Sequence, residues 1–159
     1  MENKQPLVSI VCDTYNHAPY VRDALDGFLA QETSFPIEII VHDDASTDGT
    51  ADIIREYEAA HPDLFRCVYR TENIYSSDPK ILEHYVFPLA RGKYTAICEG
   101  DDYWSDPHKL RRQLVGKTGQ GHAAAAVGRH GKQLRVLPGQ RQNRIGKSLA
   151  GRFHPHAQS

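Results

Sequence analysis

The fold of this chain is decided by a short apolar run near its start, Leu7-Val8-Ser9-Ile10-Val11-Cys12. The run is nearly continuous and rich in β-branched residues, which favour β-strands. A strand with one exposed face alternates between apolar and polar residues, whereas a strand buried on both faces has a nearly unbroken apolar sequence. The run is therefore typical of a parallel sheet that helices cover on both faces.

Further runs of this kind alternate along the chain with segments of helical spacing. We expect the later strands at Ile37–Val41, Phe65–Tyr69 and Tyr94–Cys98, and helices after Pro19, from Ser46, from Asp78 and from Asp106 to at least Leu114. Parallel strands need such crossover connections, and these are usually helices. The sequence therefore predicts an α/β fold, with a mostly parallel sheet and helices on both of its faces.

Polar side chains gather where three of these strands end. Asp13-Thr14-Tyr15-Asn16 follows the first strand, Asp43-Asp44 the second and Glu99-Gly100-Asp101-Asp102 the fourth. Ligands of parallel α/β sheets bind beyond the carboxyl ends of the strands, so neighbouring strands would bring these groups into one site. Crowded carboxylates favour a cation, and Mg²⁺ takes one or two carboxylates together with phosphate oxygens of a substrate. We expect a metal ion at this edge, with a phosphate bound to it.

Other phosphate, metal and nucleophile motifs do not fit the sequence. The loop after the first strand contains no glycine, which excludes the G-x-G-x-x-G fingerprint, and no G-x-x-x-x-G-K-[S/T] occurs. The segment from Asp44 resembles the start of a calcium loop, but its twelfth position is Arg55 instead of Glu. A response-regulator receiver needs paired acids after the first strand, where only Asp13 stands. No G-x-S-x-G elbow indicates a nucleophilic serine.

The cysteines and histidines do not have the spacing of a metal site. Three cysteines, each within an apolar run, are expected to be small buried side chains in a reducing compartment; they are Cys12, Cys67 and Cys98. We expect four histidines at the surface or at helix ends, namely His42, His61, His84 and His108. The sequence begins with no signal segment and has no run near the ~18 apolar residues of a membrane span. The expectation is a cytoplasmic protein without an integral membrane segment.

The charge is distributed unevenly along the 159 residues. Residues 1–115 carry 11 Lys and Arg against 20 Asp and Glu, a net charge of −9, whereas residues 116–159 carry 8 Lys and Arg and no acid. Eight of the twelve glycines also lie in residues 116–159, and the hydrophobic periodicity is lost there. Segments of this composition rarely offset the entropy of ordering. We expect one domain over residues 1–115 and a disordered or irregular basic tail over residues 116–159.

Three ordered blocks of this sequence resemble family 2 glycosyltransferases of the GT-A fold. The blocks are Val8 to Asn16, Glu38 to Thr50, and Gly92-Lys93-Tyr94 leading into Glu99 to Trp104. Their order and separation match the family over about residues 6–115. The resemblance implies a Rossmann-like half that binds a nucleoside diphosphate sugar, for which we favour a UDP-sugar.

The resemblance also implies roles for individual residues. Contact with the nucleoside is implied for Asp13, Thr14, Tyr15 and Asp44, with Asp43 supporting the loop. The family's D-x-D element, which binds Mg²⁺ or Mn²⁺ bridging the diphosphate, maps onto Glu99-Gly100-Asp101, with Asp102 directly behind it. Since Glu99 replaces the usual first Asp, we favour Asp101 and Asp102 as the direct metal ligands, and Asp101 also belongs to the nucleotide site.

The resemblance leaves the catalytic base without a counterpart. Inverting members of the family use a downstream Asp or Glu as general base, but this sequence has no acid after Asp106. We expect a truncation followed by sequence unrelated to the family, with sugar transfer to an acceptor hydroxyl impaired and no catalytic residue present. The alternative is a non-catalytic module that binds a nucleoside diphosphate. A nucleic-acid role for the basic tail is not expected, because Phe153 is its only aromatic residue.

Overall fold

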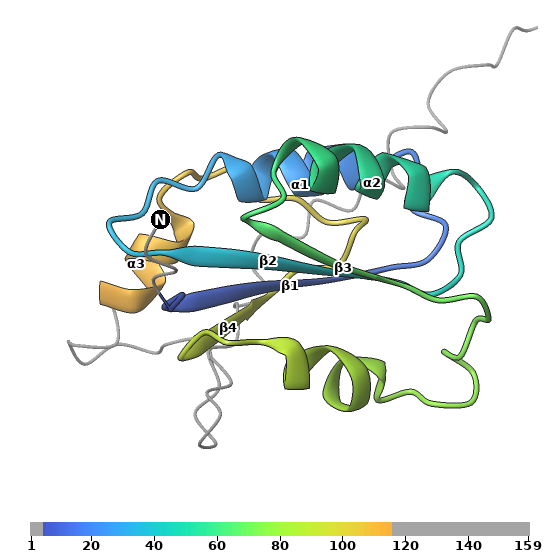
Figure 1. Ribbon diagram of the computed structural model, residues 1–159. Helices are drawn as coiled ribbons and strands as arrows, with labels where there is room; N and C mark the ends of the chain where they lie inside the picture. The colour runs from blue at the N-terminus through green and yellow to red at the C-terminus, as the bar shows by residue number, and fades with distance from the viewer. Residues whose placement is uncertain (1–4, 116–159) are drawn as a thin grey trace, which may run out of the picture.

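The computed structural model describes residues 5–115, which form a sheet of four parallel strands covered on two faces (Figure 1). The strands are β1 (Val8–Thr14), β2 (Ile37–Asp43), β3 (Phe65–Tyr69) and β4 (Tyr94–Ile97), in the order β3-β2-β1-β4. Every pairing between neighbouring strands is parallel. The predicted α/β class and parallel sheet are thereby confirmed, while the predicted tail at residues 116–159 lies outside the described residues.

Helices cover the two faces of the sheet unequally (Figure 1). The α-helices α1 (Val21–Leu29) and α2 (Thr50–Ala60) lie on one face, and the short η1 (Leu82–Val86) and η2 (Phe87–Leu89) lie on the other. The helix α3 (Lys109–Val115) follows at the amino end of the sheet. No helix within residues 5–115 has the length and apolar character needed to cross a bilayer.

Successive residues of the central strands enter two different cores, which explains their continuous apolar sequence. Ile10 and Ile39 pack with residues of α1 and α2, whereas Val11 and Ile40 pack with Val86 and the segment around it. All four of these strand residues are completely buried. Because side chains alternate between the faces of a strand, burial of both faces removes every polar position from the middle of the strand.

Strands β1 and β2 extend two residues beyond the apolar runs that predicted them. The parallel ladder continues through the pairs Asp13↔His42 and Thr14↔Asp43. Asp13 and Thr14 were expected in a loop, but the hydrogen bonding of the sheet fixes them opposite His42 and Asp43 at the end of β2. The backbone that carries these side chains is therefore fixed at the carboxyl edge of the sheet.

The expected helix after Asp78 is replaced by a π-helix and a 3₁₀-helix. Phe87 N–H donates to the carbonyl of Leu82, five residues before it, and η2 follows with Pro88 in its first turn. Proline has no N–H to donate, and it disfavours the α conformation in the residue before it. An α-helix through this proline would lack a hydrogen bond, and the chain takes other helical geometries instead.

An ion pair between a buried carboxylate and a partly exposed arginine fastens the turn that leads into β4, at the amino end of the sheet. Glu38 is 2% exposed and accepts from Arg91 Nε at 2.8 Å, from Arg91 N at 2.7 Å and from Ser9 Oγ at 2.6 Å. Ser9 Oγ in turn accepts from Gly92 N at 2.9 Å. The cluster ties β1, β2 and the 91–92 turn together across more than fifty residues of sequence, so it sets where β4 begins.

Candidate functional site at the carboxyl edge of the sheet

The ends of β1 and β2 and the acidic turn after β4 meet at one edge of the sheet. Gly100 N–H donates to the carbonyl of Asp13 at 2.9 Å, and Asp44 N–H donates to the carbonyl of Thr14 at 2.9 Å. Thr14 Oγ1 lies 3.0 Å from Asp43 Oδ1. The three polar groups singled out in the sequence are therefore held side by side, because β1 lies between β2 and β4.

Asp13 is held by a chain of buried polar groups that the sequence did not reveal. His42 is completely buried, which makes its expected surface position wrong; its Nδ1 lies 2.8 Å from Asp13 Oδ1. Arg70 Nε donates to His42 Nε2 at 3.1 Å. Since an arginine only donates, Nε2 is the acceptor and the ring proton is on Nδ1, directed at the carboxylate. The Asp13 side chain keeps 25% of its surface exposed at the edge.

The Asp43 carboxylate is buried and forms its hydrogen bonds within the protein. It is 2% exposed and accepts from Thr14 Oγ1 at 3.0 Å, from Ser46 Oγ at 2.6 Å and from Ser46 N at 3.0 Å. These bonds shape the loop that joins β2 to α2. Direct contact of Asp43 with a nucleotide stays a prediction.

Asp44 is also buried and bonded internally. It is 1% exposed, and its carboxylate accepts from Ile74 N at 3.0 and 3.2 Å and from Tyr75 N at 3.1 Å. The loop after β3 therefore covers the side chain that the resemblance assigns to the nucleoside. Tyr15, which follows β1, is 45% exposed and is open to a ligand.

The loops after β1 and β2 are joined to each other by side chains. Thr47 N donates to Asn16 Oδ1 at 2.8 Å, and Asn16 N donates to Ser46 Oγ at 2.9 Å. Asn16 and Ala45 have φ angles of 54° and 60°, a region that residues other than glycine seldom adopt. Such backbone is kept only where its surroundings enforce it, and it is frequent at binding sites. The role of Asn16 in joining the loops was not predicted, although it stands within a block that the sequence singled out.

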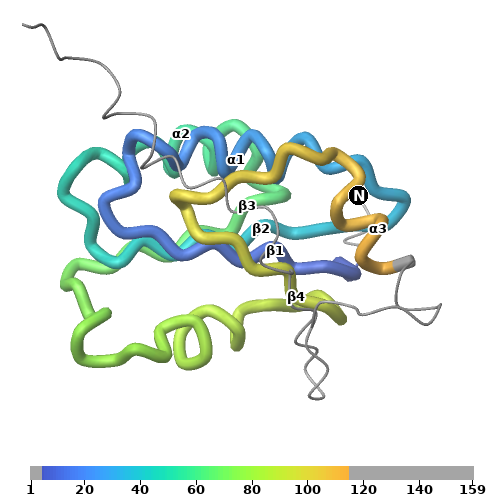
Figure 2. The backbone as a smooth tube through the Cα atoms, turned by 180° about the vertical axis from the view of Figure 1, so that it is seen from behind, coloured from blue at the N-terminus to red at the C-terminus, as the bar shows by residue number. Residues whose placement is uncertain are grey.

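The acidic turn places its carboxylates at different depths. Glu99 and Asp101 are exposed, Asp102 is partly buried, and Gly100 between them is buried. Downstream, Trp104 is 6% exposed and packs edge-on against Phe28 of α1 with 4.9 Å between ring centroids. Figure 2 shows this segment passing from β4 to the carboxyl edge and back along α1 to α3. The packing of Trp104 therefore fixes the backbone that directly follows the exposed carboxylates.

Gly100 is required by the close approach of β1. A Cβ at this position would lie 2.5 Å from Thr14 Cγ2 and 2.9 Å from His17 Nδ1. Thr14 cannot rotate away without breaking the hydrogen bonds of its hydroxyl to Asp43 and to the carbonyl of His42. The middle residue of the acidic triplet is therefore fixed as glycine by packing.

We expect Gly100→Ala to destabilise the domain by about 1–3 kcal/mol, the range for overpacking a filled site. Urea denaturation would measure this difference. Adding Thr14→Ser to the variant removes the clashing methyl group and keeps the hydroxyl, and should recover part of the loss, since the contact with His17 Nδ1 remains. Full stability of Gly100→Ala alone would contradict the packing explanation.

The donors at this edge suit a hard divalent cation. Glu99 and Asp101 offer exposed carboxylate oxygens, which Mg²⁺ and Mn²⁺ prefer. Within residues 5–115, no three His, Cys, Asp or Glu side chains are arranged as a complete metal site.

Two of the three cysteines are buried thiols whose pKa values are raised. All three are unpaired, and Cys12 and Cys98 are buried. Burial raises the pKa of Cys12 well above its usual value, and burial together with nearby carboxylates raises the pKa of Cys98 to about 12. Thiols with raised pKa values stay protonated and unreactive near neutral pH.

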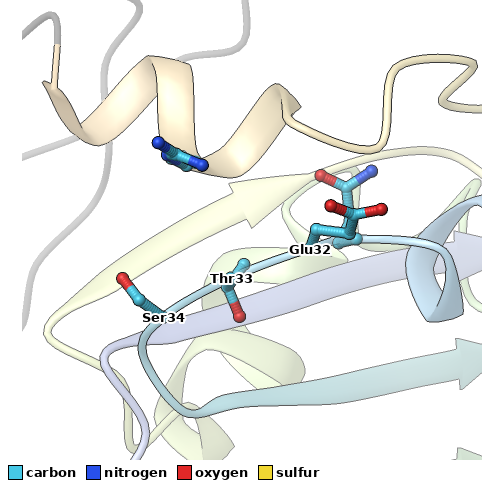
Figure 3. A pocket seen from close by; sticks show the side chains of 5 residues that line it. Glu32, Thr33 and Ser34 are labelled. Atoms are coloured by element: carbon cyan, nitrogen blue, oxygen red, sulfur yellow. The ribbon is translucent and has the colours of Figure 1, made fainter.

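A separate cavity of about 660 Å³ lies between α3 and the segment that precedes β2 (Figure 3). It is lined by Gln31, Glu32, Thr33, Ser34 and Arg111. The segment 31–34 leads into the amino end of β2, so this cavity is at the opposite edge of the sheet from the carboxylates. It contains none of the residues singled out in the sequence.

A family model and a curated relative both match this chain in sequence. The family model described as glycosyl transferase family 2 matches residues 9–156, a range that continues past residue 115. An uncharacterized protein of Mycobacterium tuberculosis is 51% identical over 109 residues, which are 67% of this chain and 30% of that protein. The chain thus spans about 30% of the length of that curated relative. The division of the chain at residue 115 stays a prediction.

Two solved structures are similar to the described fold. The mannosyltransferase PcManGT from Pyrobaculum calidifontis, in complex with GDP-Man and Mn²⁺, is 28% identical with a TM-score of 0.57, over 75% of this chain and 34% of that one. S. aureus TarS in complex with UDP-GlcNAc is 26% identical with a TM-score of 0.56, over 68% of this chain and 30% of that one. Both similarities agree with the GT-A-like arrangement of strands and helices.

Proposed function

This chain belongs to glycosyltransferase family 2, and we propose that residues 5–115 are a donor half that binds a nucleoside diphosphate sugar together with Mg²⁺ or Mn²⁺. The proposal rests chiefly on the meeting of β1 with the acidic turn, where Gly100 N–H donates to the carbonyl of Asp13 at 2.9 Å. This contact places exposed carboxylates beside the loop that carries Tyr15. A ligand with an aromatic base at one end and a diphosphate at the other suits such an edge.

The nucleoside end of the proposed site is formed by the ends of β1 and β2. We assign it to Asp13, Thr14, Tyr15, Asp43 and Asp44. Asp13 is partly exposed and held by His42, so its carboxylate can accept a hydrogen bond from a ribose hydroxyl or a base without reorganising. Tyr15 is exposed and can stack on a base, whereas Thr14 and Asp43 hold the loop in place.

The diphosphate end is formed by the acidic turn. Glu99, Asp101 and Asp102 would hold the ion, with Asp101 and Asp102 favoured as direct ligands; Glu99 and Asp101 are exposed and Asp102 is partly buried. A bound divalent ion supplies charge neutralisation for the leaving nucleoside diphosphate. The buried Gly100 and Trp104 hold the backbone of the turn beside β1 and α1.

The transfer step needs groups beyond this donor half. We propose transfer of the sugar to an acceptor hydroxyl as the reaction that the donor half serves. The 159 residues contain no Asp or Glu after Asp106, and for this reason a chain that binds the donor without transferring sugar is the second candidate. A cytoplasmic location belongs to the same proposal and is supported by three unpaired cysteines.

Removal of metal provides the direct test of the donor site. We expect calorimetric titration to show tight binding of UDP with Mn²⁺ and a loss on the order of 10- to 100-fold in affinity when a chelator replaces the ion, since the ion then no longer shields the diphosphate. GDP titrated in parallel decides the base. Equal affinity with and without Mn²⁺ would contradict the metal assignment, and absence of binding to either nucleotide would contradict the function.

An assay for sugar release and transfer separates the two candidates. Turnover of a UDP-sugar by the 159-residue chain would support the transferase. Metal-dependent binding without turnover would support the binding module.

A further inference from the structure

His42 is a buried titratable side chain to which the proposed function gives no direct contact with the donor. It is completely buried, between the carboxylate of Asp13 and the guanidinium of Arg70. We propose that Arg70 and His42 are positioning residues, which hold Asp13 ready to accept a hydrogen bond from a ribose hydroxyl of the donor nucleotide. The inference rests on the proposed function and adds to it a preference for ribonucleotides over deoxyribonucleotides.

Packing alone does not explain a histidine at this position. Val11 and Ile40, two residues earlier in β1 and β2, lie on the same face of the sheet and are completely buried among apolar side chains. Apolar residues therefore fill this layer, and a polar ring within it costs free energy unless it is hydrogen-bonded. Both ring nitrogens of His42 have a hydrogen-bond partner. The ring therefore connects its two partners in addition to filling space.

Arg70 determines which ring nitrogen of His42 carries the proton. Its Nε donates to His42 Nε2 at 3.1 Å, so the proton of the neutral ring is on Nδ1, which lies 2.8 Å from Asp13 Oδ1. Arg70 is itself held on two sides. Its backbone N–H donates to the carbonyl of Asp43 at 2.9 Å, and its guanidinium carbon lies 4.0 Å from the centre of the Tyr85 ring in η1. The N–H group that faces Asp13 is thus fixed in position.

One carboxylate oxygen of Asp13 is left for a ligand. Oδ1 faces His42, whereas Oδ2 has no hydrogen-bond partner among residues 5–115, and the side chain keeps 25% of its surface exposed. An ionised carboxylate accepts hydrogen bonds and donates none. A ligand group that pairs with Oδ2 therefore supplies an O–H or N–H donor.

The order of residues along the edge favours a ribose hydroxyl as this donor. The carbonyl of Asp13 accepts from Gly100 N–H of the acidic turn at 2.9 Å, and Tyr15 follows two residues later in the chain. Asp13 thus stands between the turn assigned to the diphosphate and the ring assigned to the base. In a nucleoside diphosphate the ribose connects these two ends and carries the hydroxyl groups, so a carboxylate at this place suits a ribose hydroxyl.

Nucleotides that lack one hydroxyl test the preference for ribose. We expect 2′-deoxy-UDP or 3′-deoxy-UDP, titrated calorimetrically into the 159-residue chain with Mn²⁺, to bind about 10- to 100-fold more weakly than UDP, the range for a hydrogen bond to a charged acceptor. The analogue that binds more weakly identifies the hydroxyl. Equal affinity for all three nucleotides would overturn this inference alone, whereas failure of the wild-type chain to bind UDP would contradict the proposed function.

Substitution of Asp13 tests whether this residue makes the contact. Asp13→Ala should lower the affinity for UDP by the same factor and leave the affinity for the weakly bound analogue unchanged, because both changes remove the same hydrogen bond. Asp63→Ala is the matched control, as an exposed aspartate before β3 at the amino edge of the sheet. Equal losses for UDP and for the analogue in Asp13→Ala would overturn the assignment.

The positioning role of His42 is tested by the ratio of the affinities for UDP and the analogue, which a general loss of stability does not change. His42→Leu should lower this ratio by about 3- to 10-fold, because Asp13 loses the N–H group that orients it. His42→Asn should keep more of the ratio, since its amide can place an N–H group near the position of Nδ1. Equal ratios in the wild type and in both variants would overturn the role of His42.

The role of Arg70 is tested by Arg70→Lys, which keeps the positive charge and removes the Nε–H group. The affinity ratio should fall, because His42 is then no longer restricted to one tautomer. Arg66→Lys, four residues earlier, is the matched control and should leave the ratio unaltered, since Arg66 donates to the carbonyl of Leu89 instead. Nitrogen-15 NMR of the imidazole should show the proton on Nδ1 in the wild type and on both nitrogens in Arg70→Lys. An unchanged ratio in Arg70→Lys would overturn the role of Arg70.

Discussion

Asp101→Asn is expected to lower the affinity for UDP in the presence of Mn²⁺ on the order of 100-fold. Asp101 is exposed in the acidic turn, and the substitution removes a negative charge and an oxygen donor without disturbing the core. Affinity measured in a chelator should be the same in the variant and the wild type, since the lost interaction involves the ion. Calorimetric titration with and without Mn²⁺ measures both quantities.

A matched control for Asp101→Asn is Asp63→Asn. Asp63 is also exposed, but it precedes β3 and so lies at the amino edge of the sheet, away from the candidate site. The control changes the net charge by the same amount and should leave binding unaltered. Unchanged affinity of Asp101→Asn for UDP with Mn²⁺ would contradict the assignment of Asp101 as a metal ligand.

Glu38→Gln is expected to produce the largest loss of stability among the substitutions considered, about 3 kcal/mol at neutral pH. Glu38 is 2% exposed, and the amide would turn an N–H group toward Arg91, which is left without its carboxylate partner. Part of the Arg91 side chain remains solvated, at 42% exposure, which places the loss at the lower end for a broken buried pair. Urea denaturation measures the difference, with Glu72→Gln as an exposed control.

The effect of Glu38→Gln should also depend on pH. Burial by itself raises the pKa of Glu38, but hydrogen bonds from Ser9 and Arg91 and the charge of Arg91 outweigh it, so the net result is a lowered pKa. A lowered pKa in the folded state gives stability above the unfolded value of about 4.3 and loses it as the pH falls through the folded value. The gap between wild type and variant should therefore close in acid, and a gap that widens below pH 4 would contradict the ion pair's role.

The site was predicted from sequence at the level of which segments meet, and less well at the level of individual atoms. Asp13, Asp43, Asp44 and the acidic turn do lie at one edge, as three strand ends indicated. Asp44 nevertheless directs its carboxylate to the backbone of Ile74 and Tyr75, thirty residues away. A strand-end aspartate has the same sequence pattern whether it faces a ligand or a neighbouring loop, so the pattern could not decide between them.

The same limit applies to histidine and to the helix before β4. His42 was expected at the surface or at a helix end, yet it is completely buried, with its place in the ladder opposite Asp13 and a hydrogen bond from Arg70. The helical spacing after Asp78 was correct for a helical segment, but Pro88 led to π and 3₁₀ geometry. In both cases the neighbouring residues determined the structure: the contacts of His42 determined its burial, and Pro88 determined the type of helix before it.

By itself, the sequence determined the class of fold, the parallel strands and the edge at which the carboxylates gather. These follow from local rules, since apolar periodicity reports burial and parallel strands all end at one edge. Only the tertiary structure decided which partner each polar group takes: Arg91 for Glu38, His42 for Asp13 and the 74–75 backbone for Asp44. These partners lie about thirty to fifty residues apart in sequence and meet only through the packing of the sheet, so no local pattern could specify them.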